Sequence, residues 1–99
     1  MLVKIHKTQD GRNLVAMCDS GLIGKKFEEG KLQLDLSSSF YKGEEKSDDE
    51  IKELLKDAYM VNVVGELSVG FCLKLNLIEE SHVIKIDGIP HAQAILTEQ

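Results

Sequence analysis

The stretch from residue 60 to residue 86 constrains the fold of this chain more than any other. Residues 61–64 have the valine-rich pattern of a buried strand, and the turn at Gly65 leads into a helix. Residues 67–75 are apolar on nearly every side, which predicts the most buried helix of the protein. Another strand follows at residues 83–86. This order predicts a strand–helix–strand unit, with parallel strands joined by a right-handed crossover.

A second helix is indicated by its start signal. Ser47-Asp48-Asp49-Glu50 forms a capping box, in which the Ser47 hydroxyl accepts a hydrogen bond from the Glu50 amide and the Glu50 side chain reaches back. Apolar side chains then recur on one face at the spacing of an amphipathic helix. We therefore expect two main helices, at about residues 48–59 and 66–75.

The other regular segments predict strands. Residues 2–7 and 13–19 suit an N-terminal β-hairpin, because Asp10-Gly11 between them supplies turn chemistry. Residues 31–36 alternate leucines with polar residues, which favours a strand with one buried face. Residues 91–96 favour a last strand at the edge of the sheet.

The segment that follows the hairpin predicts irregular structure. Asp19 is placed to cap a short turn of helix over residues 21–24. Residues 25–30 are polar and bounded by glycine, which favours a loop or a short irregular strand.

The length of 99 residues suits one domain, and no linker or repeat marks an internal boundary, so we expect a single domain over residues 1–99. Together the segments predict an α+β (α/β-type) fold with an N-terminal β-hairpin, a mixed sheet of about five strands and two main helices. The hydrophobic fraction of 42% and the charged fraction of 29% are typical of a globular protein rather than a disordered one.

The sequence also indicates where such a chain resides. It opens directly on a strand-like pattern and lacks the charged start, apolar middle and cleavage site of a signal peptide, which predicts a cytoplasmic location. No apolar run is long enough for a membrane span. Cys18 and Cys72 each lie in an apolar segment, which is typical of free, buried thiols rather than of a disulfide.

Charge is unevenly divided along the chain. The net charge of −5 disfavours strong, non-specific binding to nucleic acid, because that affinity comes mainly from cations that neutralise phosphates. Residues 1–46 carry a net charge of +1, whereas residues 47–99 carry −6. We therefore expect an anionic partner to meet the first half of the chain.

Six short motifs are spread over nearly the whole chain: Gly24-Lys25-Lys26-Phe27, Leu34-Asp35-Leu36, Phe40-Tyr41, Val64-Gly65-Glu66, Val69-Gly70 and Gly88-Ile89-Pro90-His91-Ala92-Gln93. In their order and spacing they resemble a family of small archaeal proteins of unknown function, the domain-of-unknown-function 424 family. The resemblance implies a cytoplasmic, single-domain archaeal protein that acts near the translation machinery. The family supplies no catalytic residues that could be assigned to positions of this chain.

One candidate site is a ligand pocket. The turn at Gly65 and Glu66 presents backbone amides at the start of a helix, an arrangement that binds phosphates and carboxylates. Ordinary helix capping is the alternative, because Glu66 already supplies a negative charge there. His91 and Gln93 follow a glycine turn and project to the same side of a strand, where they could bind a nucleotide base or a peptide. Alternatively, His91 is only a surface side chain of an edge strand, with no role in binding.

The other candidate site is a partner or RNA face that combines positive charge with aromatic rings, a mixture suited to phosphates and unpaired bases. Its residues are Lys25, Lys26, Lys31, Phe40, Tyr41 and Lys42. Four glutamates interleave with these lysines and cancel much of their field, so a solvated loop surface is the alternative.

Nothing in the sequence selects a catalytic group. A nucleophile needs a base and an orienting group within reach, and no spacing brings Cys18 or a serine to a histidine. The histidines have no partners at a known metal-ligand spacing, so we expect neither a metal site nor a cofactor.

These observations support two hypotheses. The first is a non-enzymatic binding module that docks on a protein or ribonucleoprotein partner through residues 25–41, which predicts that the lysines and Tyr41 are exposed together. The second is a small-ligand-binding protein or small enzyme, with a pocket between Gly65-Glu66 and Pro90-His91-Ala92-Gln93. It predicts that Glu66 converges with the His91 segment, because a helix start and the end of an adjacent parallel strand share one edge of a sheet.

Overall fold

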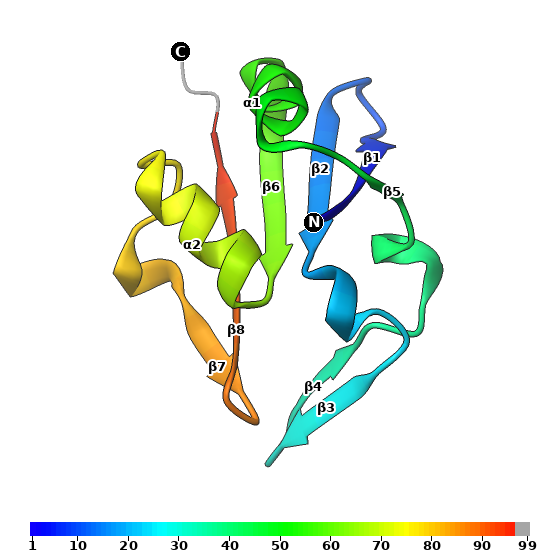
Figure 1. Ribbon diagram of the computed structural model, residues 1–99, viewed down its shortest axis with the longest axis vertical. Coiled ribbons are helices and arrows are strands. Elements are labelled where there is room, and N and C mark those ends of the chain that lie inside the picture. The colour runs from blue at the N-terminus through cyan, green and yellow to red at the C-terminus, as the bar shows by residue number, and fades with distance from the viewer. Residues whose placement is uncertain (97–99) are drawn as a thin grey trace.

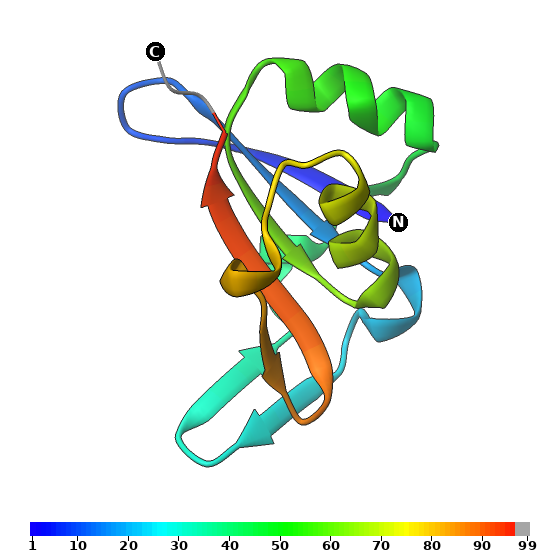
Figure 2. The ribbon, with the colours of Figure 1, turned by 90° about the vertical axis from the view of Figure 1, so that its left-hand side faces the viewer.

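The computed structural model of the protein describes residues 1–96 and has one central sheet with both helices on the same side (Figures 1 and 2). The helices are α1 (Asp48–Lys56) and α2 (Glu66–Lys74). The strand order in the sheet is β5-β1-β2-β6-β8-β7. These strands are β1 (Leu2–Lys7), β2 (Asn13–Cys18), β5 (Glu44–Glu45), β6 (Ala58–Val64), β7 (Ile84–Ile86) and β8 (Ile89–Ile95).

The opposite side of the sheet carries smaller elements. A separate two-stranded sheet is formed by β3 (Lys26–Glu29) and β4 (Leu32–Asp35), which projects from the molecule as a hairpin (Figure 1). Two short 3-10 helices, η1 (Ser20–Leu22) and η2 (Ser39–Tyr41), also lie on this side. A third, η3 (Glu80–His82), follows α2, and the residues that flank it pack in the core on the helix side. The fold class, the N-terminal hairpin and the two helices are therefore confirmed. The strand expected at residues 31–36 lies in the small sheet, and β5 is the strand that the sequence did not predict.

The strand pairing differs from the expected unit in one respect. β2 and β6 are parallel, whereas β6 pairs antiparallel with β8, and β8 pairs antiparallel with β7. The strands on either side of α2 do run in the same direction, but β8 lies between them. The strand predicted at residues 91–96 is present as β8, but it is not the last strand at the edge of the sheet, because β7 pairs with its first three residues, 89–91. The tight turn at Asp87 and Gly88, both with positive φ, folds β8 back against β7, and the other edge of β8 pairs with β6.

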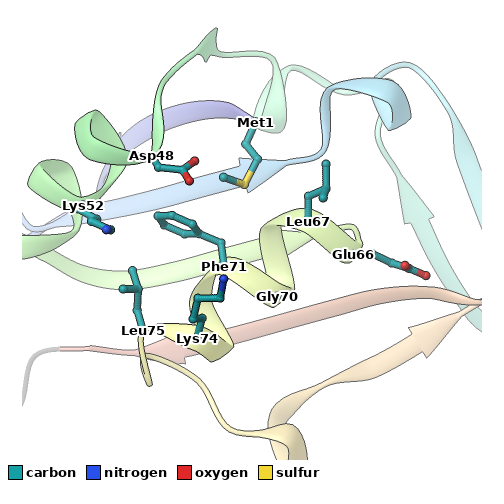
Figure 3. Close-up of a pocket in the computed structure, with 9 residues that line it drawn as sticks. All are labelled: Met1, Asp48, Lys52, Glu66, Leu67, Gly70, Phe71, Lys74 and Leu75. Carbon is teal, nitrogen blue, oxygen red and sulfur yellow. The ribbon is translucent and has the colours of Figure 1, made fainter.

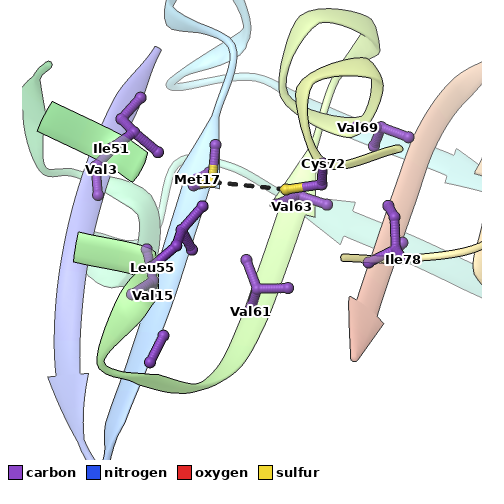
Figure 4. Close-up of a cluster of buried hydrophobic side chains, with 12 residues drawn as sticks. Val3, Val15, Met17, Ile51, Leu55, Val61, Val63, Val69, Cys72 and Ile78 are labelled. Carbon is purple, nitrogen blue, oxygen red and sulfur yellow. Dashed lines mark hydrogen bonds between the residues drawn. The ribbon is translucent and has the colours of Figure 1, made fainter. Parts of the chain in front are cut away.

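Side chains of the sheet alternate between two hydrophobic cores. On the helix side, Val15 and Met17 pack with Val61 and Val63 beneath α1 and α2 (Figure 4). On the other side, alternate residues of the same strands pack against β4 and η2. That second core contains Ala16, Cys18, Leu34, Leu36, Tyr41, Val64 and Ile86. The sheet is thus the middle layer of the molecule.

Helix α2 is only partly covered by this packing. Ser68, Val69 and Cys72 are buried, but the Leu67 side chain is 70% exposed and Phe71 is half-buried. A helix that is apolar on every side and packed on one side must leave apolar surface in water.

Both cysteines are free and buried, as the sequence predicted. Among residues 1–96, no helix is long and apolar enough to span a membrane.

Candidate functional site

The N-terminus of α2 is capped by a carboxylate that lies far away in the sequence. Asp19, which follows β2, accepts hydrogen bonds from the backbone amides of Leu67 at 2.9 Å and Ser68 at 2.8 Å, and from the Ser68 hydroxyl at 2.8 Å. Gly65 has a φ of 105°, and a methyl group there would clash with the Asp19 carboxyl group. An external anion would therefore have to displace Asp19. The short turn of helix predicted after Asp19 and Ser20 is present as η1, with Asp19 as its N-cap residue, but the Asp19 side chain caps α2 and not η1.

A polar cluster on the sheet face away from the helices joins residues from both predicted sites. At its centre is Asn62 of β6, whose Oδ1 accepts a hydrogen bond from the Tyr41 hydroxyl. His91 Nε2 lies 3.2 Å from the same oxygen, and Asn62 Nδ2 donates to Gln93 Oε1 at 3.2 Å. The register explains this proximity, since Asn62 is directly opposite Gln93 in the antiparallel pair, and Val64 is opposite His91.

His91 presents an unused acceptor. Asn62 Oδ1 can only accept, so His91 carries its proton on Nε2 and leaves Nδ1 as the acceptor. Among the residues that the structure describes, Nδ1 is buried and has no hydrogen-bond partner. Burial lowers the pKa of His91, which keeps the ring neutral near pH 7. Because this nitrogen is buried, it can accept a hydrogen bond only from an N–H or O–H group of a ligand that enters the protein interior.

The predicted pocket residues are only partly brought together. The Gly65 amide donates to the Pro90 carbonyl at 2.9 Å, so the turn does lie beside His91. They meet because β8 runs antiparallel to β6, and not because of a parallel pair. Glu66, however, is exposed and borders a groove on the helix side (Figure 3).

The residues of the predicted partner face are also only partly exposed together. Lys25, Lys26 and Lys31, with Lys42 after η2, are exposed. Tyr41 is only 6% exposed and belongs to the second core, so the expectation that it is exposed with the lysines is wrong. Phe40 is half-buried and stacks on His6, with ring centroids 4.4 Å apart. The Tyr41 ring is therefore not free to stack on a base, and one face of the Phe40 ring is occupied by His6.

The groove on the helix side, between α1 and α2, is a feature that the sequence analysis missed. It has a volume of about 630 Å³, and Leu67, Phe71 and Leu75 of the α2 region form its apolar side (Figure 3). Its other lining residues are Met1, Asp48, Lys52, Glu66, Gly70 and Lys74. The signal was present, because a helix that is apolar all round has more apolar surface than one neighbouring layer can cover. Asn62 was also missed, although it is the single polar residue among the valines of its strand.

The arrangement offers little for covalent chemistry. Burial raises the pKa of the Cys18 thiol to about 11 and that of Cys72 to about 12, so both are poor nucleophiles near pH 7. Across residues 1–96, no three histidine, cysteine, aspartate or glutamate side chains gather closely enough to hold a metal ion.

Comparison with known proteins identifies relatives of the chain. No curated protein matches it. The crystal structure of an uncharacterized conserved protein from the archaeon Methanopyrus kandleri is similar, with a TM-score of 0.80 and 26% sequence identity over 99% of this chain and 92% of that chain. A family model, described as protein of unknown function (DUF424), matches residues 6–96. The match covers most of the sequence, so the chain belongs to the DUF424 family of proteins of unknown function.

Proposed function

We propose that this protein is a non-enzymatic binding module that docks on a partner protein through the groove between α1 and α2. The observation that carries the proposal is Leu67, whose side chain is 70% exposed at the rim of this groove. Beside it, Phe71 and Leu75 continue one apolar stripe (Figure 3). Exposed apolar surface of this kind marks protein interaction sites in soluble domains.

The shape and charge of the groove fit an amphipathic helix of the partner. Such a helix places apolar side chains three or four residues apart, which matches the spacing of Leu67, Phe71 and Leu75. Lys52 and Lys74 lie toward one end of the groove together with Asp48, and Glu66 lies at the other end (Figure 3). A basic residue of the partner helix beside Glu66 would complement that second end.

The lysines support a ribonucleoprotein as the source of this partner. Lys25, Lys26 and Lys31 on the β3–β4 hairpin are exposed, as is Lys42. We expect these lysines to contact phosphates. Base stacking by Tyr41, which the sequence had suggested, is not part of this proposal, because the Tyr41 ring is buried. A cytoplasmic role near the translation machinery is part of this proposal, and it rests on the family resemblance.

Partner capture from native lysate tests the proposal. We expect Leu67→Asp to abolish recovery of a discrete partner protein without loss of stability, because Leu67 is exposed. Lys25→Glu with Lys26→Glu should reduce the recovery of RNA and make it less dependent on salt. Lys85→Glu, on the exposed strand β7, is the matched control. Unchanged recovery with Leu67→Asp would contradict the groove as the docking site.

A second candidate function is small-ligand binding beside His91, as the alternative hypothesis held. It is favoured by the buried Nδ1 atom, which has no partner among residues 1–96. The site would comprise Gly65, His91 and Gln93, without Glu66, which borders the groove on the helix side, and would select a neutral ligand with an N–H or O–H donor. A thermal-shift screen of metabolites tests it, because His91→Ala should remove any stabilisation that the wild type shows.

A further inference from the structure

The outer edge of β1 is only partly paired. β5 covers two residues of β1, with Leu2 opposite Glu45 and Val3 opposite Glu44. Within residues 1–96, no strand pairs with this side of β1 beyond Val3. We propose that the free edge of β1 binds an acidic, extended segment of a partner protein as an additional strand.

Backbone groups of Ile5 and Lys7 point toward the free edge. The Thr8 amide donates to the Arg12 carbonyl at 2.8 Å, which makes Lys7 and Asn13 a non-hydrogen-bonded pair. The same alternation makes Ile5 and Val15 a non-hydrogen-bonded pair. The N–H and C=O groups of Ile5 and Lys7 are therefore directed away from β2, so an added strand has two residues with which to exchange hydrogen bonds.

The residues before β5 do not continue along the edge of β1, and a groove lies between them and β1. Gly43 lies directly against the Val3 carbonyl, where a larger residue would clash. The preceding segment is held on the face of the sheet instead, because Lys4 Nζ donates to the Ser39 carbonyl at 3.2 Å and His6 Nε2 lies 2.8 Å from the Phe40 carbonyl. The resulting cavity of about 400 Å³ borders Ile5, which is 42% exposed.

The charged residues around this groove favour one kind of partner segment. Lys4, Lys42 and Lys46 line it, and Lys7 is exposed at the continuation of the edge. One carboxylate, Glu44, is among the lining residues, and it forms an ion pair with Lys46 at 3.2 Å. This local excess of positive charge stands out in a protein with a net charge of −5. It favours acidic segments, and it disfavours a second copy of β1, whose lysines would meet these.

Nuclear magnetic resonance titration with a defined peptide tests the inference. The probe is a capped Glu-Val-Glu-Val-Glu-Val peptide, and a capped Lys-Val-Lys-Val-Lys-Val peptide is its charge-reversed control. We expect the acidic peptide to shift the amide signals of Ile5 and Lys7 and to slow their hydrogen exchange. Binding of the basic peptide with equal affinity, or shifts confined to the α1–α2 groove, would overturn the proposal.

Variants separate the backbone contribution from the charge contribution. Ile5→Pro removes an N–H group that β2 does not use, and should lower the affinity at least about tenfold, whereas Ile5→Val keeps the N–H group and should retain binding. Lys7→Glu and Lys42→Glu should each weaken binding at least about fivefold, and Lys52→Glu should not.

Two further measurements complete the test. Leu67→Asp should leave peptide binding unchanged, so this inference and the proposed docking groove can fail separately. Equal binding by Ile5→Pro and Ile5→Val would contradict the added strand, as would a dimer in sedimentation equilibrium that protects the Ile5 and Lys7 amides without peptide.

Discussion

At the scale of single residues, Asp19 is a buried carboxylate that caps α2. Its carboxylate satisfies two backbone amides of α2 and the buried Ser68 hydroxyl. We expect Asp19→Ala to lower the free energy of unfolding by about 2–3 kcal/mol, because it removes a helix cap and leaves buried donors without acceptors. Urea denaturation measures this loss. Asp19→Asn keeps an acceptor oxygen and should lose less. A loss below about 0.5 kcal/mol for the alanine variant would show that the cap does not stabilise the fold.

The two thiols provide a prediction about pH. The pKa is about 11 for Cys18 and about 12 for Cys72, whereas thiols in the unfolded chain ionise near pH 8.5. The folded state therefore resists ionisation, so its stability is fully present below about pH 8.5 and falls as the pH rises toward 11. Denaturation at a series of pH values should show this decline, with a shallower slope when both cysteines are replaced by alanine.

Reactivity of the thiols is an independent check. With Ellman's reagent at pH 8, the native protein should react far more slowly than the urea-unfolded protein, because both side chains are buried. Rapid labelling of the native protein would contradict the burial of Cys18 and the packing of Cys72, on α2, against Met17 of the sheet.

At the scale of elements, the two glycines of the α2 region give a matched pair. Gly65 has a positive φ and lies against Asp19, so Gly65→Ala introduces both strain and a clash. Gly70 lies within the helix, and a methyl group there meets no neighbouring atom within 4 Å. Gly65→Ala should destabilise the protein by about 2 kcal/mol or more, whereas Gly70→Ala should stabilise it by about 0.5–1 kcal/mol. Thermal denaturation of both variants measures the difference, and equal effects would contradict the described turn.

Local sequence patterns located most elements but not their arrangement. The capping box at Ser47 is present as predicted, since its hydroxyl accepts from the Glu50 amide at 3.2 Å. The helix ends at Lys56 rather than near residue 59, because Ala58 and Tyr59 already belong to β6. The central position of β8 could not be predicted, because the order of strands depends on long-range pairing rather than on local periodicity.

The candidate sites were also predicted only in part, because local patterns do not reveal contacts between residues far apart in the sequence. Sequence patterns identified His91 and Gln93 as neighbours on one strand face, but they gave no reason to connect them with Tyr41. That connection passes through Asn62, to which Tyr41 and His91 both bind. The Asp19 cap of α2 joins residues 48 and 49 positions apart, a distance over which no sequence motif operates.

At the scale of the whole molecule, two hydrophobic cores share one sheet. Ile51 belongs to the core on the helix side, and Leu36 belongs to the core on the other side. Because β2 and β6 contribute to both, we expect a single cooperative unfolding transition. Ile51→Ala and Leu36→Ala should each destabilise that same transition by about 2–5 kcal/mol. Circular dichroism and tyrosine fluorescence should give coincident urea curves, and two separate transitions would contradict this coupling.

The layered arrangement also separates the surfaces that the protein offers. The apolar groove lies on the helix side, the His91 cluster lies on the opposite face, and the lysine-rich edge of β1 lies at the margin of the sheet. Apart from Lys42, which belongs both to the lysines proposed to contact phosphates and to the β1 groove, the proposed binding functions depend on different residues. We therefore expect variants of those other residues to separate the functions.

Site-specific photo-crosslinking can capture a partner protein that docks in the α1–α2 groove. A photoreactive phenylalanine analogue replaces Leu67 in one protein and Lys85, outside the groove, in a control. The account predicts that native lysate yields a discrete crosslinked protein from position 67, through an amphipathic helical segment, and that Phe71→Asp abolishes it. No crosslink at position 67, or the same product from position 85, would contradict docking in this groove.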